Sequence, residues 1–365
     1  MGLSGTPLRL LPFYCSIRLF ARGAVLPPHH LVAIDRRSEV VTQTQSSQEA
    51  TPQKVSIQDP LEGYAFFEGR VVPIAEAKVS IATHALQYGT ACFEGIRAYW
   101  NPNHEQLYVL KMREHYQRMM HSWNVMRFNL PYSIEDLERI TIELLRKHNY
   151  RQDVYIRPIA YKASLTVKPR LTGLKDEFAI YTFGMGNYVD IESGLRVCTS
   201  SWRRANSNAM PVRAKVTGGY VNSALATEDA LASGFDEAIM LTHDGYVSEG
   251  SSCNLFILRN GKLATPAPSE DILEGITRNT LIQLVRDEFG MTVEERRIDR
   301  TELYASEEMF LCGTGVQVSP VISVDHRPIG SGRPGPFTMK LQALYLAACR
   351  GENDKYRHWL TPVYE

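Results

Sequence analysis

Residues 212–220 read VRAKVTGGY and set one lysine, Lys215, among neighbours that include no acidic side chain. Further along, residues 246–250 read YVSEG, a glycine-bounded turn that carries Glu249. A lysine amine can form a Schiff base with an aldehyde cofactor, and a carboxylate can keep a pyridine nitrogen protonated. The pair therefore suggests pyridoxal phosphate. Most lysines are solvated surface charges, however, and Glu249 could equally be a solvated residue of an ordinary hairpin.

The composition is that of a large, electrically neutral protein. The chain has 365 residues, of which 44% are hydrophobic, and its 40 basic side chains equal its 40 acidic ones. This length can bury a large core and favours two domains or one large one. Neutral charge favours neither nucleic acid nor an anionic membrane as a partner. No apolar run approaches the roughly 18 uncharged residues that a membrane-spanning helix needs.

The cysteines and histidines give no metal-binding pattern. There is no C-x-x-C pair and no H-E-x-x-H arrangement, so we expect no metal. Scattered cysteines in a chain of this size fit a reducing compartment, where they act as small core residues. The six are Cys15, Cys92, Cys198, Cys253, Cys312 and Cys349.

The first sixty residues differ in composition from the rest. Residues 1–34 contain three arginines and no acid, and residues 41–58 are rich in Ser, Thr and Gln. This stretch is either an organelle transit peptide, which would place the protein in a mitochondrial matrix, or a disordered tail on a cytoplasmic protein. Pro12, Pro27 and Pro28 break any long helix. We leave residues 1–60 out of the predicted fold.

From residue 61 onward the pattern is that of an α/β (α+β) protein. Turn residues at 184–194 suggest a linker between a small α/β domain, 61–183, and a larger domain, 195–365. Strands are predicted in 64–72 around Glu68-Gly69, and at 107–110, 154–161, 177–183, 195–200, 236–242, 254–258 and 308–311. Asn260-Gly261 is predicted to form a tight hairpin turn. Three helices are predicted at 112–126, 220–234 and 336–350. Two more are predicted by their starts: one begins at a capping box of Ser133 and Asp136, and the other begins at Gly275.

Two polar turns could bind a phosphate group. Residues 275–278 read GITR at a helix start, which supplies free backbone N–H groups and a hydroxyl. Residues 312–315 read CGTG after a strand and add another hydroxyl with further backbone donors. The alternative for the first turn is a simple threonine N-cap, with Thr277 serving only the helix.

A series of ordered motifs resembles the class IV aminotransferases, and most closely the branched-chain amino-acid aminotransferases. The motifs are HALQYG at 84–89, FEGIR at 93–97, YIRP at 155–158, Lys215 with GGY at 218–220, SEG at 248–250 with NLF at 254–256, GITR at 275–278, and GT at 313–314. The resemblance covers residues from about 61 to the C-terminus. It implies a fold-type-IV architecture, with pyridoxal 5'-phosphate between the small domain and a larger pseudo-barrel domain. It also implies a homodimer or higher homo-oligomer in which each active site borrows a loop from its neighbour.

The resemblance assigns cofactor roles to residues of this chain. Lys215 corresponds to the catalytic lysine that forms the Schiff base and then shuttles the proton. Glu249 corresponds to the partner of the pyridine nitrogen, and Tyr220 to the phenol that bonds the O3' atom. The other cofactor-binding positions are Arg118, Leu273, Ile276, Thr277 and Thr314, of which Arg118 could alternatively be a solvated helix residue.

The resemblance also implies the substrates. An arginine fork suits a carboxylate, so Arg157, with the backbone near Gly315, corresponds to the end that receives the α-carboxylate. The wall around the aliphatic side chain corresponds to Tyr88, Phe93, Tyr155, Met185 and Tyr188, with Met185 where many relatives have tryptophan. The expected reaction converts leucine, isoleucine or valine and 2-oxoglutarate into branched 2-oxo acids and glutamate.

Other functions remain open at this point. A D-amino-acid or (R)-amine transaminase would use the same lysine and glutamate, and so would an aminodeoxychorismate-type lyase. From a different class, a binding protein without catalysis could contact anions through basic spots at 202–204 and 213–215.

Overall fold

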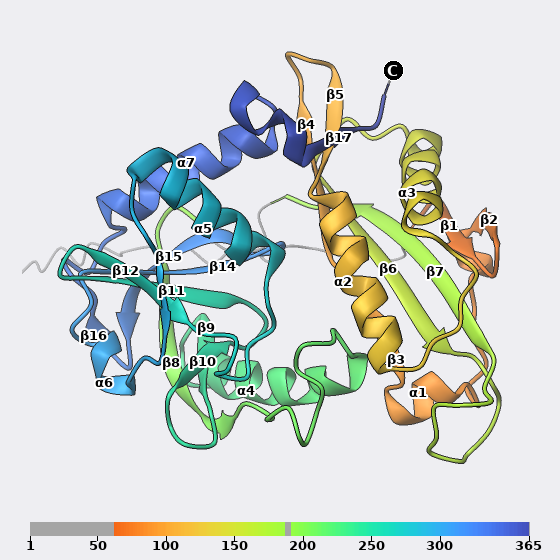
Figure 1. Ribbon diagram of the computed structural model, residues 1–365, viewed down its shortest axis with the longest axis horizontal. Coiled ribbons are helices and arrows are strands. Elements are labelled where there is room, and N and C mark those ends of the chain that lie inside the picture. The colour runs from red at the N-terminus through yellow and green to blue at the C-terminus, as the bar shows by residue number, and fades with distance from the viewer. Residues whose placement is uncertain (1–61, 187–190, 365) are drawn as a thin grey trace, which may run out of the picture. The chain divides into compact units, whose positions relative to one another are not determined.

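Two β-sheets dominate the part of the chain that the structure, a computed structural model, describes: residues 62–186 and 191–364. The first sheet uses residues 64–184 and the last strand of the chain, and the second uses residues 195–328 (Figure 1). The predicted leader and the centre of the predicted linker lie outside the described residues.

All neighbouring strands of the first sheet are antiparallel. A tight turn at Glu68 and Gly69, with φ of 48° and 82°, joins its first two strands as predicted. The strand order is β17 (Leu360–Pro362), β5 (Gln106–Leu110), β4 (Ile96–Asn101), β6 (Val154–Lys162), β7 (Asp176–Gly184), β1 (Tyr64–Phe67) and β2 (Arg70–Pro73), with β3 (Ala91–Phe93) beside β6.

Two amphipathic helices cover the first sheet. Helix α2 (Met112–Val125) and helix α3 (Ile134–His148) bury their apolar stripes in one cluster with the sheet, as the helical spacing predicted. The predicted capping box is present, since the Ser133 side chain accepts from the Asp136 amide and the Asp136 side chain accepts from the Ser133 amide. A short helix, α1 (His84–Tyr88), ends at Gly89 in the left-handed conformation.

The second sheet is mixed, with three parallel pairs of strands. The predicted hairpin turn at Asn260 and Gly261 is confirmed, with φ of 51° and 69°. The strand order is β10 (Val247–Gly250), β9 (Glu237–Leu241), β8 (Leu195–Arg203), β15 (Gln317–Val324), β14 (Glu308–Gly313), β11 (Asn254–Arg259), β12 (Lys262–Pro266) and β13 (Glu294–Arg296), with β16 (Arg327–Pro328) beside β15.

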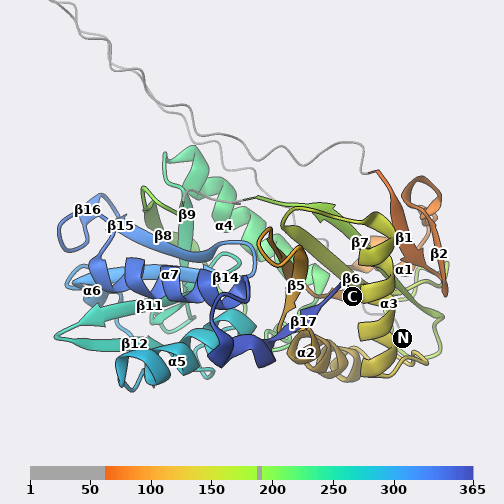
Figure 2. The same cartoon turned by 90° about the horizontal axis from the view of Figure 1, so that it is seen from above.

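The helices of the second half lie in separate places around this sheet. Helices α5 (Ile276–Phe289) and α7 (Pro336–Cys349) pack together over a core that contains Phe256 and Phe310. Helix α4 (Tyr220–Ala232) lies apart from them (Figure 2) and packs its alanines in another cluster with β9. The remaining short helices are α6 (Arg300–Leu303), η1 (Ile74–Glu76), η2 (Thr217–Gly219) and η3 (Asp354–Trp359).

A partly buried ion network ties α7 to the first sheet. The two terminal nitrogens of Arg350 each lie 3.0 Å from an Asp153 oxygen, and the Trp100 amide donates to the same carboxylate at 2.9 Å. Buried Arg97 lies 3.7 Å from it as well. The C-terminal strand β17 also joins the first sheet, so the end of the chain contributes to both halves of the fold.

Asp153→Ala should lower the free energy of unfolding by about 3 kcal/mol, because buried Arg97 and partly buried Arg350 lose their shared acceptor. Urea unfolding measures this change. Asp354→Ala is the matched control, since that side chain is 92% exposed in its pair with Arg357 and its removal should cost less than about 0.5 kcal/mol. Equal losses in the two variants would contradict a structural role for the network.

Candidate functional site

The backbone around Lys215 is bonded to the first sheet. The Phe93 amide donates to the Lys215 carbonyl at 3.0 Å, and the Gly218 amide donates to the Gly89 carbonyl at 3.1 Å. The Ser122 hydroxyl of α2 accepts from the Lys215 amide at 3.2 Å. The approach is close, because a Cβ on Gly89 would lie 2.6 Å from the Gly218 Cα. These three hydrogen bonds fix where the lysine side chain begins.

The Lys215 amine lies against aromatic side chains. Its Nζ donates to the Tyr220 hydroxyl at 2.6 Å and lies 5.0 Å from the centroid of the Phe93 ring. Tyr220 is the first residue of α4, directly after the glycines of η2. The structure therefore brings Lys215 and Tyr220 together, and both line a small cavity that Arg204 and Leu273 also border.

Glu249 is buried, so its alternative as a solvated hairpin residue is wrong. It lies on β10 and is 3% exposed. Its Oε1 lies 2.6 Å from an Arg204 nitrogen, while Oε2 accepts from Asn254 at 2.9 Å and from the Leu273 amide at 3.2 Å. Burial raises the pKa of this carboxyl against the opposing effect of the Arg204 charge. The sequence did not predict Arg204 as a site residue.

The N-terminus of α5 has the features of an anion-binding site. Gly275 is the N-cap and no side chain caps the helix, so the alternative of Thr277 as an N-cap is wrong. The first amides of a helix have no acceptor within it, and they attract anions. A Cβ on Gly275 would lie 2.1 Å from the Asn254 Oδ1, so a larger residue here would displace the Asn254 side chain. Arg118 reaches this turn, since its Nη1 donates to the Glu274 carbonyl at 3.0 Å.

Arg118 is held by a buried carboxylate, so its alternative as a solvated residue is wrong. Its Nε and Nη2 each bond an oxygen of Glu94 at 2.7 Å, and His115 Nδ1 lies 2.9 Å from the same carboxylate. Glu94 is 0% exposed. Burial by itself raises the pKa of Glu94, but the Arg118 charge and these bonds lower it below its ordinary value. Sequence reasoning missed Glu94 as a functional residue although it stands in the FEGIR motif.

The predicted carboxylate-binding arginine, Arg157, lies against two residues of the predicted aromatic wall. The Arg157 Nη2 donates to the Tyr155 hydroxyl at 2.9 Å, and its guanidinium carbon lies 4.3 Å from the centroid of the Phe93 ring. Phe93 in turn lies 4.9 Å from the Tyr220 ring, measured between centroids. Among the described residues, the buried Arg157 Nε has no hydrogen-bond partner. Arg157 and the Lys215 amine therefore both lie against the Phe93 ring.

Buried Arg97 holds three further backbone positions of the site. Its Nη2 donates to the carbonyls of Met185 at 3.1 Å and Gly186 at 2.8 Å, and its Nη1 donates to that of Gly315 at 3.5 Å. This arginine was not predicted as a site residue. Of the other predicted wall residues, Tyr88 is 40% exposed and donates to the Val167 carbonyl at 2.5 Å, whereas Tyr188 lies outside the described residues.

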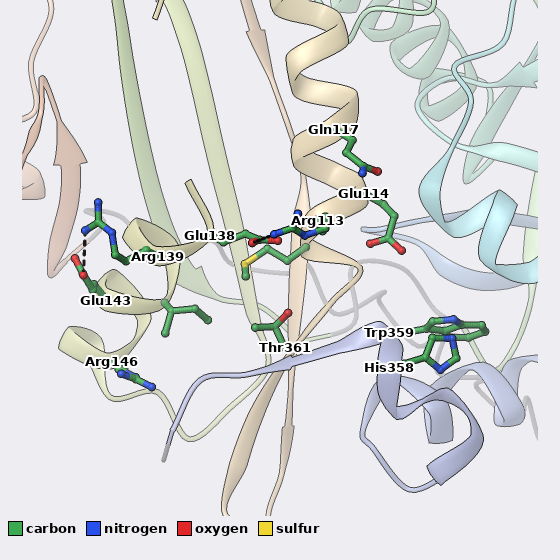
Figure 3. Close-up of a pocket in the computed structure, with 12 residues that line it drawn as sticks. Arg113, Glu114, Gln117, Glu138, Arg139, Glu143, Arg146, His358, Trp359 and Thr361 are labelled. Carbon is green, nitrogen blue, oxygen red and sulfur yellow. Dashed lines mark hydrogen bonds and ion pairs between the residues drawn. The ribbon is translucent and has the colours of Figure 1, made fainter. Parts of the chain in front are cut away.

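A wider groove lies elsewhere and contains none of the predicted site residues. Its volume is about 650 Å³, and it runs between α2, α3 and residues 358–361 (Figure 3). Two of its arginines have carboxylate partners, Arg113 with Glu138 at 2.8 Å and Arg139 with Glu143 at 3.2 Å. Within the described ranges, no cluster of three His, Cys, Asp or Glu side chains could hold a metal, and no helix is long and apolar enough to span a membrane.

Glu94→Gln should lower the free energy of unfolding by about 3 kcal/mol at pH 7, because Arg118 loses its buried counter-ion. The deficit should shrink as the pH falls below the ordinary carboxyl pKa of 4.5, since a lowered pKa in the folded state stabilises the wild type only above that range. Chemical unfolding at several pH values measures both effects. The control, Glu143→Gln in an exposed pair, should change stability by less than about 0.5 kcal/mol.

Comparisons with known proteins agree with this geometry. The family model described as amino-transferase class IV matches residues 91–324. A probable branched-chain-amino-acid aminotransferase of Aquifex aeolicus is 53% identical over 302 residues, which cover 83% of this chain and 97% of that protein. A branched-chain-amino-acid aminotransferase of Pseudomonas aeruginosa is 37% identical and covers 83% of this chain and 98% of its own length.

Solved structures match over the same share of the chain. The branched-chain aminotransferase of Thermoproteus uzoniensis with norvaline has a TM-score of 0.80 at 42% identity, covering 83% of this chain and all of that one. The enzyme of Thermobaculum terrenum in its PLP-form has a TM-score of 0.80 at 37% identity, covering 83% and 99%. These matches confirm the predicted fold and family. The chain belongs to the class IV aminotransferases.

Proposed function

We propose that this protein transfers the amino group of L-leucine, L-isoleucine or L-valine to 2-oxoglutarate, with pyridoxal 5'-phosphate as cofactor. The products are the branched 2-oxo acid and L-glutamate. The single observation that carries the proposal is the Lys215 amine, bonded to the Tyr220 hydroxyl in a cavity that Arg204, the partner of buried Glu249, also lines. The names and titles of the relatives, which include branched-chain substrates and the PLP-form, support it.

The residues present fit the cofactor group by group. Pyridoxal phosphate supplies an aldehyde for a lysine amine and a pyridine ring that accepts electrons from the substrate Cα. Lys215 would hold the aldehyde, and Glu249 would accept from the ring nitrogen. The amides of Ile276 and Thr277 at the start of α5, with Arg118 and Thr314, would bind the phosphate.

Lys215 also has the position of a general base. Its amine donates to the phenol of Tyr220 and lies 5.0 Å from the centroid of the Phe93 ring. Once free, this amine would take a proton from the substrate Cα and deliver it to the C4' atom of the cofactor. The Tyr220 hydroxyl, at 2.6 Å, holds the amine in place for both steps.

The substrate would be bound from the first sheet. The Arg157 guanidinium, 2.9 Å from the Tyr155 hydroxyl, suits the α-carboxylate because its fork can make two parallel bonds. The Phe93 ring and Met185, which is 9% exposed, offer apolar surface to an aliphatic side chain. Because the glutamate side chain must enter the same space, the Tyr155 hydroxyl would serve its γ-carboxylate.

An exposed apolar patch supports a homodimer. We define the patch as Val79, Ile81, Leu86, Leu165 and Val167, all at least 50% exposed. Its two segments are one surface, since Tyr88 and His84 of α1 bond the carbonyls of Val167 and Lys168. Such a patch is typical of an interface. It lies beside Gly89, which bonds the Lys215 segment, so a second copy seated here would reach the active site.

The double variant Ile81→Asp/Val167→Asp should sediment as a single chain, where the wild type sediments as a dimer or larger assembly, because two charges would be buried in the interface. Its transaminase rate should fall with the loss of the neighbouring loop. Leu231→Asp, on an exposed position of α4, is the control and should keep the wild-type mass. A wild type that sediments as a monomer would contradict the proposal.

Lys215→Ala should abolish the yellow colour of the purified protein and lower kcat by at least about 10⁴-fold, because the attachment point and the proton carrier are lost together. Absorbance spectra and an assay with L-leucine and 2-oxoglutarate measure this. Lys262→Ala, whose side chain is 71% exposed, should behave as wild type. Unchanged colour and rate in Lys215→Ala would refute the assignment.

A panel of amino donors decides between this reaction and its alternatives. L-Leu, L-Val, D-Ala and an (R)-amine are each tested with 2-oxoglutarate and then with pyruvate. We expect the L-donors to react, whereas activity on D-Ala or the amine alone would indicate the other transaminases. Pyruvate release without use of a 2-oxo acid would indicate a lyase. Anion binding that disappears with added salt, without colour, would indicate a non-catalytic binding protein.

For localisation we propose the cytoplasm, with a mitochondrial matrix as the alternative if residues 1–60 are a transit peptide. Mass determination of the N-terminus of the protein isolated from its own cells distinguishes them. Removal of the leader would indicate import.

A further inference from the structure

Arg204 is a buried cation that the proposed reaction has not yet used. It follows β8 and is fixed by its own backbone, whose amide donates to the Leu241 carbonyl at 2.9 Å. Its side chain is 14% exposed. In the sequence it belonged to the basic spot at 202–204, where an external anion was the suggested partner. The structure points this arginine inward instead.

The guanidinium of Arg204 joins two parts of the site. One terminal nitrogen lies 2.6 Å from the Glu249 Oε1, and the other donates to the Ser223 hydroxyl at 3.2 Å. Ser223 lies on α4, three residues after Tyr220, and is 5% exposed. Arg204 also lines the cavity that contains Lys215. It therefore lies between the carboxylate and the helix that carries the phenol.

The bonds to Glu249 leave one acceptor position free on its Oε1 atom. A carboxylate offers about four acceptor positions. The Oε2 atom uses two, for Asn254 and the Leu273 amide, whereas Oε1 takes its bond from Arg204. Of the described cations, Arg204 is the one within ion-pair distance of Glu249. The other two donors are uncharged, so Arg204 supplies the nearest compensating charge for the buried carboxylate.

We propose that Arg204 is a positioning residue that keeps Glu249 ionised and directs its Oε1 at the ring nitrogen of the cofactor. This inference rests on the proposed function, because it takes Glu249 as the partner of that nitrogen. Arg204 itself acts only through Glu249.

Loss of Arg204 has a definite chemical consequence. Glu249 is 3% exposed, and a buried carboxylate without a counter-ion takes up a proton. A neutral carboxylic acid donates a hydrogen bond to the ring nitrogen instead of accepting one from a protonated ring. The ring then loses its positive charge and with it much of its capacity to accept electrons.

The test compares two ligands on the cofactor-free protein. One is pyridoxal phosphate, and the other is its analogue with CH in place of the ring nitrogen, which keeps the aldehyde and phosphate. Arg204→Met should weaken binding of pyridoxal phosphate by about 10- to 100-fold, the effect of one charged hydrogen bond. It should leave binding of the analogue within about twofold. Arg204→Lys, which keeps the charge, should recover most of the preference for pyridoxal phosphate.

The variants separate positioning from simple damage. In a Glu249→Gln background, Arg204→Met should have little further effect on either ligand, because the residue through which it acts is gone. Equal weakening of both ligands by Arg204→Met, or no weakening of either, would overturn the inference. If Arg204→Met does not fold, Arg204→Lys decides in the same way, since loss of its ligand preference overturns the inference. Failure of the wild type to bind pyridoxal phosphate refutes the proposed function itself.

Discussion

The site depends on one backbone contact, the hydrogen bond from the Phe93 amide to the Lys215 carbonyl. It holds the lysine segment on the edge of β3 in the first sheet. Glu249 and the N-terminus of α5 belong to the second half of the fold. The lysine amine therefore meets its partners because β3, with Gly89 and Ser122 beside it, fixes the backbone of a loop that belongs to the second half.

The two buried carboxylates of the site, Glu94 and Glu249, are each paired with an arginine. Arg118 bonds both oxygens of Glu94, and Arg204 forms an ion pair with Glu249. An unpaired charge at such depth would cost several kcal/mol, so each pair also fixes the geometry of its members. The first pair lies beside the predicted phosphate position and the second beside the predicted ring nitrogen. A cofactor with a negative end and a protonated ring is complementary to this arrangement.

Local signals in the sequence predicted much of the fold. The capping box at Ser133 and the turn at Asn260-Gly261 each depend on neighbouring residues, and both are present. Strand β4 was not predicted, because it is buried almost throughout and therefore shows no alternation of polar and apolar residues. Strand β17 was missed because its pairing with β5 is set by residues 250 positions away.

The site, too, combines features that local sequence signals predict with contacts between distant segments. The motifs predicted Lys215, Tyr220 and Glu249 as site residues, because each stands in a short local pattern. They did not reveal that Glu94 grips Arg118 or that Arg97 holds the backbone of Met185 and Gly315, because these contacts join distant segments. Burial of Glu249 and Arg118 likewise followed only from the packed structure. The sequence thus predicted candidate site residues, and the structure shows the contacts that hold them.

The central claim is that Lys215 is the residue to which pyridoxal phosphate attaches. Its most direct test is borohydride reduction of the purified protein, followed by protease digestion and mass spectrometry of the peptides. The account predicts one phosphopyridoxyl group per chain, on the peptide that contains Lys215. A label on any other lysine, or no label in a yellow protein, would contradict it.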